Sequence, residues 1–326
     1  MTLLLNRDDV IRSLDMQACM ECVEMAFAEL AEGTAVLPLR ISITPPDGLA
    51  LYMPAYLKKM GALACKVVTV YKKNPEKFSL PTTIGKVLLQ EPTTGEVICI
   101  MDGGYLTAVR TGAASGVATR YLVKKGHNGV AGIFGAGVQA KMQLWAVSLA
   151  VDLSKALVYD ISGEAALNFK TEMSAKLNLE IIVAESPDKL LEEADIICTA
   201  TSSSNPLFDG GKIRPGTHIN GIGSHTPTAR ELDSTAVSRS LLVADSYEAC
   251  LSEAGDIMIP IKEGVINRQH LKAELGEIIT GKKPGRRSEN EITLFKSNGL
   301  AIQDAAAAKL AFENAKKMGL GREISI

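Results

Sequence analysis

A glycine turn carries the strongest chemical signal in this chain. Gly135, Gly137 and Ala140 form a G-x-G-x-x-A pattern. The two glycines permit a tight turn and let backbone N–H groups approach a pyrophosphate, and the small third residue lets a following helix pack closely. The first turn of that helix adds partial positive charge, which stabilises an anion. The pattern therefore predicts a dinucleotide-binding turn.

An acidic residue at the right distance strengthens this prediction. Asp160 ends the next apolar segment, about 20 residues after Ala140, where a carboxylate accepts hydrogen bonds from the adenosine ribose hydroxyls. Its charge repels a 2′-phosphate, and the next positions, Ile161, Ser162 and Gly163, bring no basic residue. NAD is therefore favoured, with NADP possible. The alternative is a glycine turn followed by a solvated aspartate at a strand end.

Three cationic residues could receive an anionic substrate. Arg40 follows Pro38 at the start of an apolar segment. Lys66 stands among apolar residues, where burying its charge costs desolvation free energy unless the charge is paired. Burial also lowers the pKa of a lysine toward values at which it can act as an acid or base. The alternative is a lysine that faces outward from an alternating strand. Arg110, beside Thr111, either clamps a carboxylate or phosphate or is a surface charge on a helix.

His225 is a further candidate proton carrier. It follows the apolar segment 217–223, and open parallel sheets bind ligands at the carboxyl ends of their strands. The alternative is a loop histidine that bonds the backbone.

The six cysteines favour packing over metal or redox chemistry. Cys19 and Cys22 form a CxxC, but they lie among apolar residues at helical spacing, and no second pair follows at metal-ligand spacing. We therefore predict core packing for this pair and no metal site. Three others lie in apolar segments that resemble strands: Cys65, Cys99 and Cys198. Because buried cysteine behaves as a small hydrophobe, we expect a reducing, cytoplasmic compartment.

The first third of the chain predicts one helix and then a sheet. Asp15 and Gly33 are the expected start and stop of the helix. The apolar segments that follow favour a mostly antiparallel or mixed sheet with a turn at 92–95. The expected strands lie at 39–43, 49–57, 62–71, 83–90 and 96–102. A helix over 105–125, with small residues at 112–116, is expected to approach a neighbour closely.

From residue 129 short apolar strands alternate with helical segments, which predicts a parallel sheet covered on both faces. The expected strands lie at 129–135, 156–160, 179–185, 194–201, 217–223 and 240–245, and the expected helices at 138–150 and through 177. Residues 281–287 are expected to form a solvated basic loop before the segment 292–299 and a final helix over 301–317.

Length and charge limit the possible classes of protein. A chain of 326 residues favours two domains. The formal net charge of −2 disfavours nucleic-acid binding through a general positive field. Apolar runs stay below the roughly 18 residues that a membrane span needs, so we expect no integral membrane protein. Arg7, Asp8 and Asp9 come too early for a secretory signal.

Together, these features resemble the ornithine cyclodeaminase/μ-crystallin family over nearly the whole chain. The segments that carry the resemblance are LPLR with Arg40, the strand with Lys66, LPT (80–82), AVRTGAASG (108–116), GAGVQA (135–140), Asp160, THINGIGSHTP (217–227), RELD (230–233) and FKSNGLAIQDAAAAK (295–309). The resemblance implies an α/β homodimer. Residues 1–120 with 300–326 would form an α+β domain for substrate binding and dimerisation, and residues 121–299 a doubly wound Rossmann domain for NAD.

The resemblance also implies hydride exchange between NAD(P) and a small α-amino or cyclic α-imino acid, as in archaeal-type alanine dehydrogenase or pyrroline-2-carboxylate and ketimine reductases. By position, Arg40 matches the residue that binds the substrate carboxylate, Lys66 the residue that binds substrate and transfers the proton, and Asn298 a residue beside the substrate. With the glycine turn and the positions after Asp160 included, the expected cofactor contacts are Thr82, Arg110, Thr111, Gly135, Ala136, Gly137, Val138, Gln139, Asp160, Ile161, Ser162, Thr201, Ile222, Gly223, Ser224 and Ser297.

One departure separates this chain from the cyclodeaminases of the family. They place an aspartate in the loop after residues 219–223, and this chain has His225 there. A histidine does not supply the fixed negative charge that cyclisation needs. Lys66 and His225 are therefore taken as the catalytic candidates of an oxidoreductase. Ornithine cyclodeamination, and μ-crystallin-like binding of a small ligand, are the two alternatives.

Overall fold

The computed structural model describes residues 1–124, 126 and 129–325. It divides into two compact units, residues 1–111 with 300–326 and residues 112–299. The expected division lay at residues 120 and 121, whereas the units meet inside helix α4 (Gly103–Leu122), between Thr111 and Gly112. A boundary inside one continuous helix leaves no turn or linker residues in the sequence. The sequence pattern therefore could not locate this boundary between the two units.

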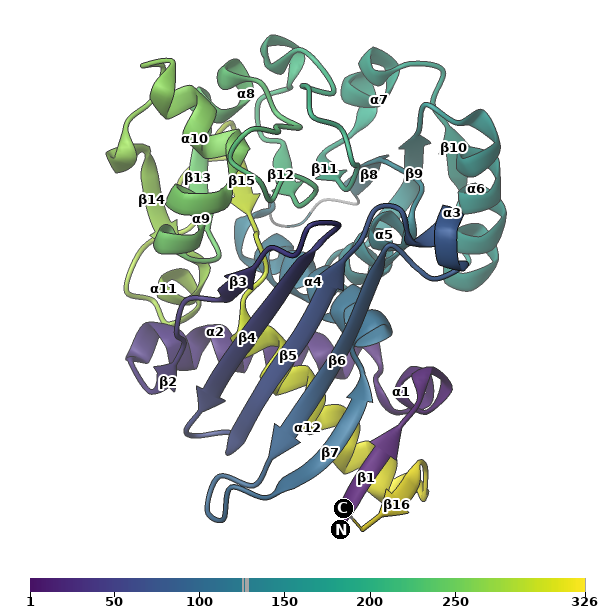
Figure 1. Cartoon of the computed structure of the whole chain (residues 1–326). Helices are drawn as coiled ribbons and strands as arrows, with labels where there is room; N and C mark the ends of the chain where they lie inside the picture. Colours follow the sequence, from purple (N-terminus) through teal and green to yellow (C-terminus); the bar gives the residue numbers. More distant parts are fainter. Residues whose placement is uncertain (125, 127–128, 326) are drawn as a thin grey trace. The chain divides into compact units, whose positions relative to one another are not determined.

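The first unit contains an eight-stranded mixed sheet (Figure 1). Its strand order is β16-β1-β7-β6-β5-β4-β2, with β3 paired to β4. Neighbouring strands are antiparallel, except that β1 and β7 run parallel. The strands are β1 (Thr2–Leu5), β2 (Ala35–Val36), β3 (Ile41–Ile43), β4 (Leu49–Leu57), β5 (Ala62–Val70), β6 (Thr83–Gln90), β7 (Val97–Asp102) and β16 (Arg322–Ile324). The mixed sheet expected for this part of the chain is therefore confirmed.

Helices α2 (Met16–Glu32) and α12 (Ala301–Met318) pack on each other, and α12 lies along β4, β5 and β6. As expected, α2 begins after Asp15, whose side chain accepts a hydrogen bond from Ala18 N, and ends at Gly33 with φ +77°. The CxxC cysteines are buried within α2, which confirms their packing role. Two shorter helices, α1 (Arg7–Ser13) and α3 (Asn74–Phe78), complete this unit together with the first part of α4.

The second unit contains an eight-stranded sheet in which every described neighbouring pair is parallel (Figure 1). The strand order is β10-β9-β8-β11-β12-β15-β13-β14. The strands are β8 (Gly129–Phe134), β9 (Leu153–Tyr159), β10 (Ile181–Val183), β11 (Ile196–Thr199), β12 (His218–Gly221), β13 (Ser240–Ala244), β14 (Leu271–Glu274) and β15 (Ile292–Lys296). From β8 the chain first proceeds toward β10 and then returns to β11, which creates a topological switch point beside β8, as in doubly wound folds.

The helices of this unit accompany its strands. They are α5 (Val138–Ala150), α6 (Gly163–Leu177), α7 (Pro187–Glu193), α8 (Ser234–Ser238), α9 (Tyr247–Glu253), α10 (Gly255–Lys262) and α11 (Leu275–Ile279), with 3₁₀ turns η1 (Gly210–Lys212) and η2 (Arg268–His270). A Cβ on Gly112 of α4 would lie 2.5 Å from Met142 O of α5, so the small residues do permit close helix packing. None of the helices described here combines the length and the apolar character of a membrane span.

The basic loop at 281–287 differs in part from the expectation. Lys282 and Arg287 are exposed, but Arg286 is half-buried. Its guanidinium donates to carbonyl oxygens of Leu122 and Thr217 and to the Thr293 hydroxyl. Arg286 therefore ties α4 to β15, so for this residue the solvated-turn interpretation was wrong.

Candidate functional site

Lys66 lies on the helix-covered face of the first unit's sheet. It stands opposite Met53 of β4 and Val87 of β6, and both of these side chains are buried. Only 3% of Lys66 is exposed, and its Nζ lies 2.8 Å from Asp304 Oδ2 of α12. The outward-facing alternative is therefore wrong: Lys66 is a buried, paired ammonium.

Arg110 shares the same carboxylate. Its Nε donates to Asp304 Oδ1 over 2.9 Å, and its Nη1 donates to Gln303 Oε1 over 2.7 Å. The residue is 5% exposed, so the alternative of a surface helix charge is wrong as well. We call Lys66, Arg110 and Asp304 the Lys66 cluster; it sets two cations against one carboxylate.

Burial and this surplus of positive charge together determine how Lys66 titrates. Burial and the neighbouring Arg110 lower the pKa of Lys66 to about 8, although Asp304 acts in the opposite direction. The positive charge of Arg40 lowers this pKa further. Lys66 can therefore exchange a proton close to neutral pH, which an ordinary lysine cannot do.

The sheet register explains why Arg40 lies close enough to matter. Ile41 of β3 stands opposite Tyr52 of β4, so the position before Ile41 falls beside Met53. Met53 in turn stands opposite Lys66. Arg40 is half-buried at this point, which gives the region around Lys66 a second positive group of the kind that pairs with a carboxylate.

The glycine turn of the second unit has the geometry that its sequence predicts. Gly135 adopts φ +99°, and a Cβ there would lie 2.6 Å from Ala200 O, so glycine is required. A Cβ on Gly137 would meet nothing within 4 Å. Ala140 is fully buried, as the third small residue of the pattern should be. The backbone around Gly137 therefore faces open space.

Helix α5 begins at this turn without a side-chain cap. Uncapped N–H groups at a helix start are ready donors for an anion. Val138 is exposed, and the buried Oε1 of Gln139 has no hydrogen-bond partner among the described residues. The uncapped helix start beside open space fits a dinucleotide pyrophosphate bound here.

Asp160 ties the glycine turn to the end of β9. Its Oδ2 accepts from Ala136 N over 2.8 Å, and its Oδ1 accepts from Ser162 N over 2.9 Å. The carboxylate is therefore anchored by the backbone rather than loosely solvated. Ile161 beside it is 97% exposed and offers an apolar surface at the position expected for the adenosine half.

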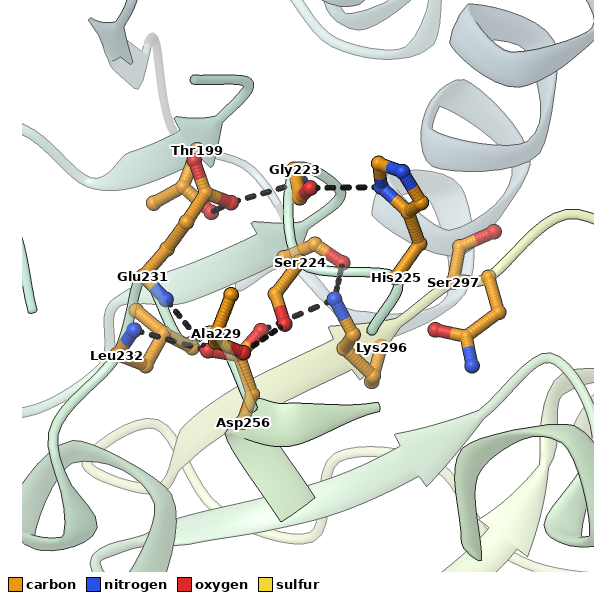
Figure 2. Close-up of polar contacts among 12 residues, drawn as sticks. Thr199, Gly223, Ser224, His225, Ala229, Glu231, Leu232, Asp256, Lys296 and Ser297 are labelled. Carbon is orange, nitrogen blue, oxygen red and sulfur yellow. Dashed lines mark hydrogen bonds and ion pairs between the residues drawn. The ribbon is translucent and has the colours of Figure 1, made fainter. Parts of the chain in front are cut away.

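A buried glutamate joins the loops that follow β11 and β12 (Figure 2). The Glu231 carboxylate accepts from Thr199 Oγ1, Thr201 N, Thr201 Oγ1 and Gly223 N, each over 2.7 Å. Burial raises the pKa of the Glu231 carboxyl above its usual value, and the hydrogen bond from Thr201 offsets only part of this shift. Ser224 is also buried, and its hydroxyl donates to Ala229 O. Thr201 and Gly223, two expected cofactor contacts, are thus brought together.

His225 is exposed on the loop after β12, and its Nδ1 lies 3.0 Å from Gly223 O (Figure 2). This is the backbone contact of the alternative interpretation, and a catalytic role for His225 stays a prediction. The Thr111 hydroxyl donates to Thr107 O within α4. Thr82 is half-buried, and its carbonyl accepts from Tyr71 N.

Asp245 shapes the segment after β15. Its Oδ2 accepts from the Ser297 hydroxyl over 3.0 Å, from Asn298 N over 2.7 Å and from Gly299 N over 2.8 Å. The Asn298 amide donates to Ala249 O, and its buried Oδ1 has no hydrogen-bond partner among the described residues. That oxygen is the part of Asn298 left for a further donor.

Sequence reasoning missed four residues that organise these sites: Gln303, Asp304, Glu231 and Asp245. Asp304 carried a weak signal, because it is an isolated acid in an alanine-rich helix. Glu231 lies in the RELD segment (230–233) that carries the family resemblance, but nothing in the sequence near Glu231 or Asp245 indicates the contacts that burial creates for them.

Comparison with known proteins identifies relatives that span the whole chain. A family model described as "Ornithine cyclodeaminase/mu-crystallin family" matches residues 1–319. A Δ1-pyrroline-2-carboxylate reductase of Bacillus cereus is 37% identical over 326 residues, 99% of each chain. The structure of Thermococcus litoralis Δ1-pyrroline-2-carboxylate reductase with NADH and L-proline is 50% identical, with a TM-score of 0.95, over 99% of this chain and 100% of the other. An archaeal alanine dehydrogenase dimer with bound NAD is 35% identical, with a TM-score of 0.94, over 99% of both chains.

Proposed function

Because the chain belongs to the ornithine cyclodeaminase/μ-crystallin family, we propose that it reduces Δ1-pyrroline-2-carboxylate to L-proline with NADH. Its reaction class is that of an NAD(H)-dependent oxidoreductase of small α-amino or cyclic α-imino acids. The cyclic imine as substrate is supported by the 50% identity to a reductase whose structure holds NADH and L-proline. The observation that carries the chemistry is the buried Lys66 with a pKa of about 8.

Two groups of the first unit suit this substrate. Arg40 pairs with the substrate carboxylate as a bidentate donor. Lys66, as the ammonium, gives a proton to the imine nitrogen, which makes the imine carbon electrophilic. Asp304 holds the Lys66 amine in place, while burial and the charge of Arg110 keep the pKa of Lys66 near neutrality. Asn298, with one buried oxygen still to satisfy, is proposed to contact the substrate.

The cofactor is proposed to lie across the second unit's sheet. Gly135, Gly137 and the start of α5 would hold the pyrophosphate, and Asp160 the adenosine ribose. When bound, the reduced nicotinamide supplies the hydride for the imine carbon. The remaining expected cofactor contacts, including Thr82, Thr201 and Ser297, stay part of this proposal.

We further propose a homodimer formed through the uncovered face of the first unit's sheet. Ile41, Ile43, Tyr52 and Ile84 lie on the face opposite Lys66, and each is more than a third exposed. An apolar sheet face of this kind is typical of an interaction surface. An alanine dehydrogenase with a similar fold is described as a dimer, which supports a second copy of this chain as the partner. Six free thiols support a reducing, cytoplasmic compartment.

A spectrophotometric screen tests the reaction. Consumption of NADH and of NADPH is measured with Δ1-pyrroline-2-carboxylate and, separately, with pyruvate and ammonia. We expect kcat/KM to be at least about tenfold higher with the cyclic imine, and higher with NADH, since Asp160 repels a 2′-phosphate. A preference for pyruvate and ammonia would instead identify an alanine dehydrogenase. Proline formed from ornithine without net NADH would identify a cyclodeaminase, and no turnover with any substrate would favour a binding protein.

A further inference from the structure

The strand order indicates which loops face each half of a bound dinucleotide. The glycine turn follows β8, and Asp160 follows β9 on one side of β8. Strands β11 and β12 lie on the other side. If the adenosine ribose meets Asp160, the nicotinamide half must extend toward the loops after β11 and β12. This step rests on the proposed function, because it assumes the cofactor placement given there.

Glu231 is the side chain that joins those two loops. Its Oε1 accepts from Thr201 N and Thr201 Oγ1 in the loop after β11. Its Oε2 accepts from Thr199 Oγ1 at the end of β11 and from Gly223 N in the loop after β12. Each carboxylate oxygen therefore receives one backbone N–H and one hydroxyl, at 2.7 Å in all four cases.

The surrounding backbone is built to fit this carboxylate. A Cβ on Gly223 would lie 2.4 Å from Glu231 Oε1 and 2.4 Å from Thr201 O. Residue 223 must therefore be glycine for the carboxylate to sit between the loops. The two loops and the carboxylate form one close-packed group, in which a shift of one member displaces the others.

Glu231 is itself held by a second carboxylate. Asp256 Oδ1 accepts from Glu231 N over 2.7 Å and from Leu232 N over 3.0 Å. Asp256 Oδ2 lies 2.9 Å from Nζ of Lys296 (Figure 2). The same Nζ also donates to Gly221 O. The position of Glu231 is thus fixed from α10 and β15, both outside the two loops.

We propose that Glu231 is a positioning residue that sets the affinity for the nicotinamide half of NADH by fixing the loops after β11 and β12. Glutamine cannot replace it. The amide NH₂ would face either Thr201 N–H or Gly223 N–H, whichever way the side chain is turned, and a backbone N–H cannot rotate to accept. One of the two loops must therefore move in the variant.

The test compares two ligands on one variant. Dissociation constants for NADH and for ADP-ribose, which lacks the nicotinamide, are measured by calorimetry on wild type and Glu231→Gln. We expect NADH to bind about tenfold more weakly to the variant, with ADP-ribose changed less than about twofold. Glu263→Gln is the matched control, since it makes the same chemical change at the exposed end of α10, and both ligands should bind it as they bind wild type.

Other outcomes overturn the proposal. Unchanged NADH affinity in Glu231→Gln, or an equal loss for both ligands, would show that Glu231 does not act on the nicotinamide half. If Glu231→Gln does not fold, Thr199→Val removes one buried donor to Oε2, and we expect a selective loss of NADH affinity of about threefold; no loss overturns the proposal. If Glu231→Gln loses NADH affinity selectively but the wild type does not reduce the imine, the proposed function is contradicted and the role of Glu231 is not.

Discussion

The two units each bury a group of three charged side chains, with opposite compositions. The Lys66 cluster sets two cations, Lys66 and Arg110, against Asp304. In the second unit Glu231 and Asp256 are two anions beside Lys296. All of these side chains are almost fully buried, so each group carries a surplus charge that water cannot stabilise.

The two surpluses are resolved in different ways. In the second unit, backbone N–H groups and hydroxyls donate to the carboxylates, so the surplus anion is satisfied by the fold and serves to position loops. In the Lys66 cluster the surplus is positive, and burial together with the charge of Arg110 lowers the pKa of Lys66 to about 8. Hydrogen bonds within the fold satisfy the surplus negative charge of the second unit, so that group has a structural role. The lowered pKa of Lys66 instead makes this lysine available for proton transfer.

The largest expected effect comes from removing the reactive lysine. Lys66→Met should lower the rate of imine reduction by at least about 10³-fold, because no other group replaces the proton donor. NADH should bind with its normal dissociation constant, since Asp304 keeps its partner Arg110. Steady-state kinetics and NADH titration check this, with the exposed Lys59→Met as the control. A wild-type rate in Lys66→Met would remove Lys66 from the mechanism.

The same substitution in the other group should act on stability. Lys296→Met removes the cation that pairs with Asp256. It leaves two carboxylates, those of Asp256 and Glu231, fully buried without a cation beside them. Breaking a buried ion pair in this way costs about 3–5 kcal/mol of unfolding free energy. Urea denaturation of Lys296→Met and Lys66→Met side by side measures the difference. Equal stability of the two variants would contradict the distinction between the groups.

The smallest effect sharpens the role of Asp304. Above about pH 8, Lys66 loses its proton, so imine reduction should slow as the pH rises and proline oxidation should speed up. The charge of Asp304 raises the pKa of Lys66, so Asp304→Asn should move this fall in reduction rate to lower pH, by about one unit. Profiles of kcat/KM against pH check both statements. A fall that stays at the wild-type pH would exclude Asp304 from the control of Lys66.

Much of the fold could be predicted because its signals are local. Apolar periodicity gave the long strands and helices, and Asp15 and Gly33 marked the ends of α2. Short elements such as β2, β14 and α8 were missed, since a few residues carry too little pattern to predict an element. The small residues of α4 were correctly expected at a close approach, and the structure identifies α5 as the neighbour.

The sequence by itself determined the glycine turn, the acid after the next strand and the lysine within an apolar strand. Each depends on residues close together in the chain, whose backbone conformation or desolvation follows from their types. Only the tertiary structure decided what those residues do together. It brought Asp304 to Arg110 from 194 residues away along the chain and to Lys66 from still farther, and it placed Glu231 between two loops. Charge compensation in a buried place is a property of the packed fold, because it depends on which side chains burial brings within hydrogen-bond distance.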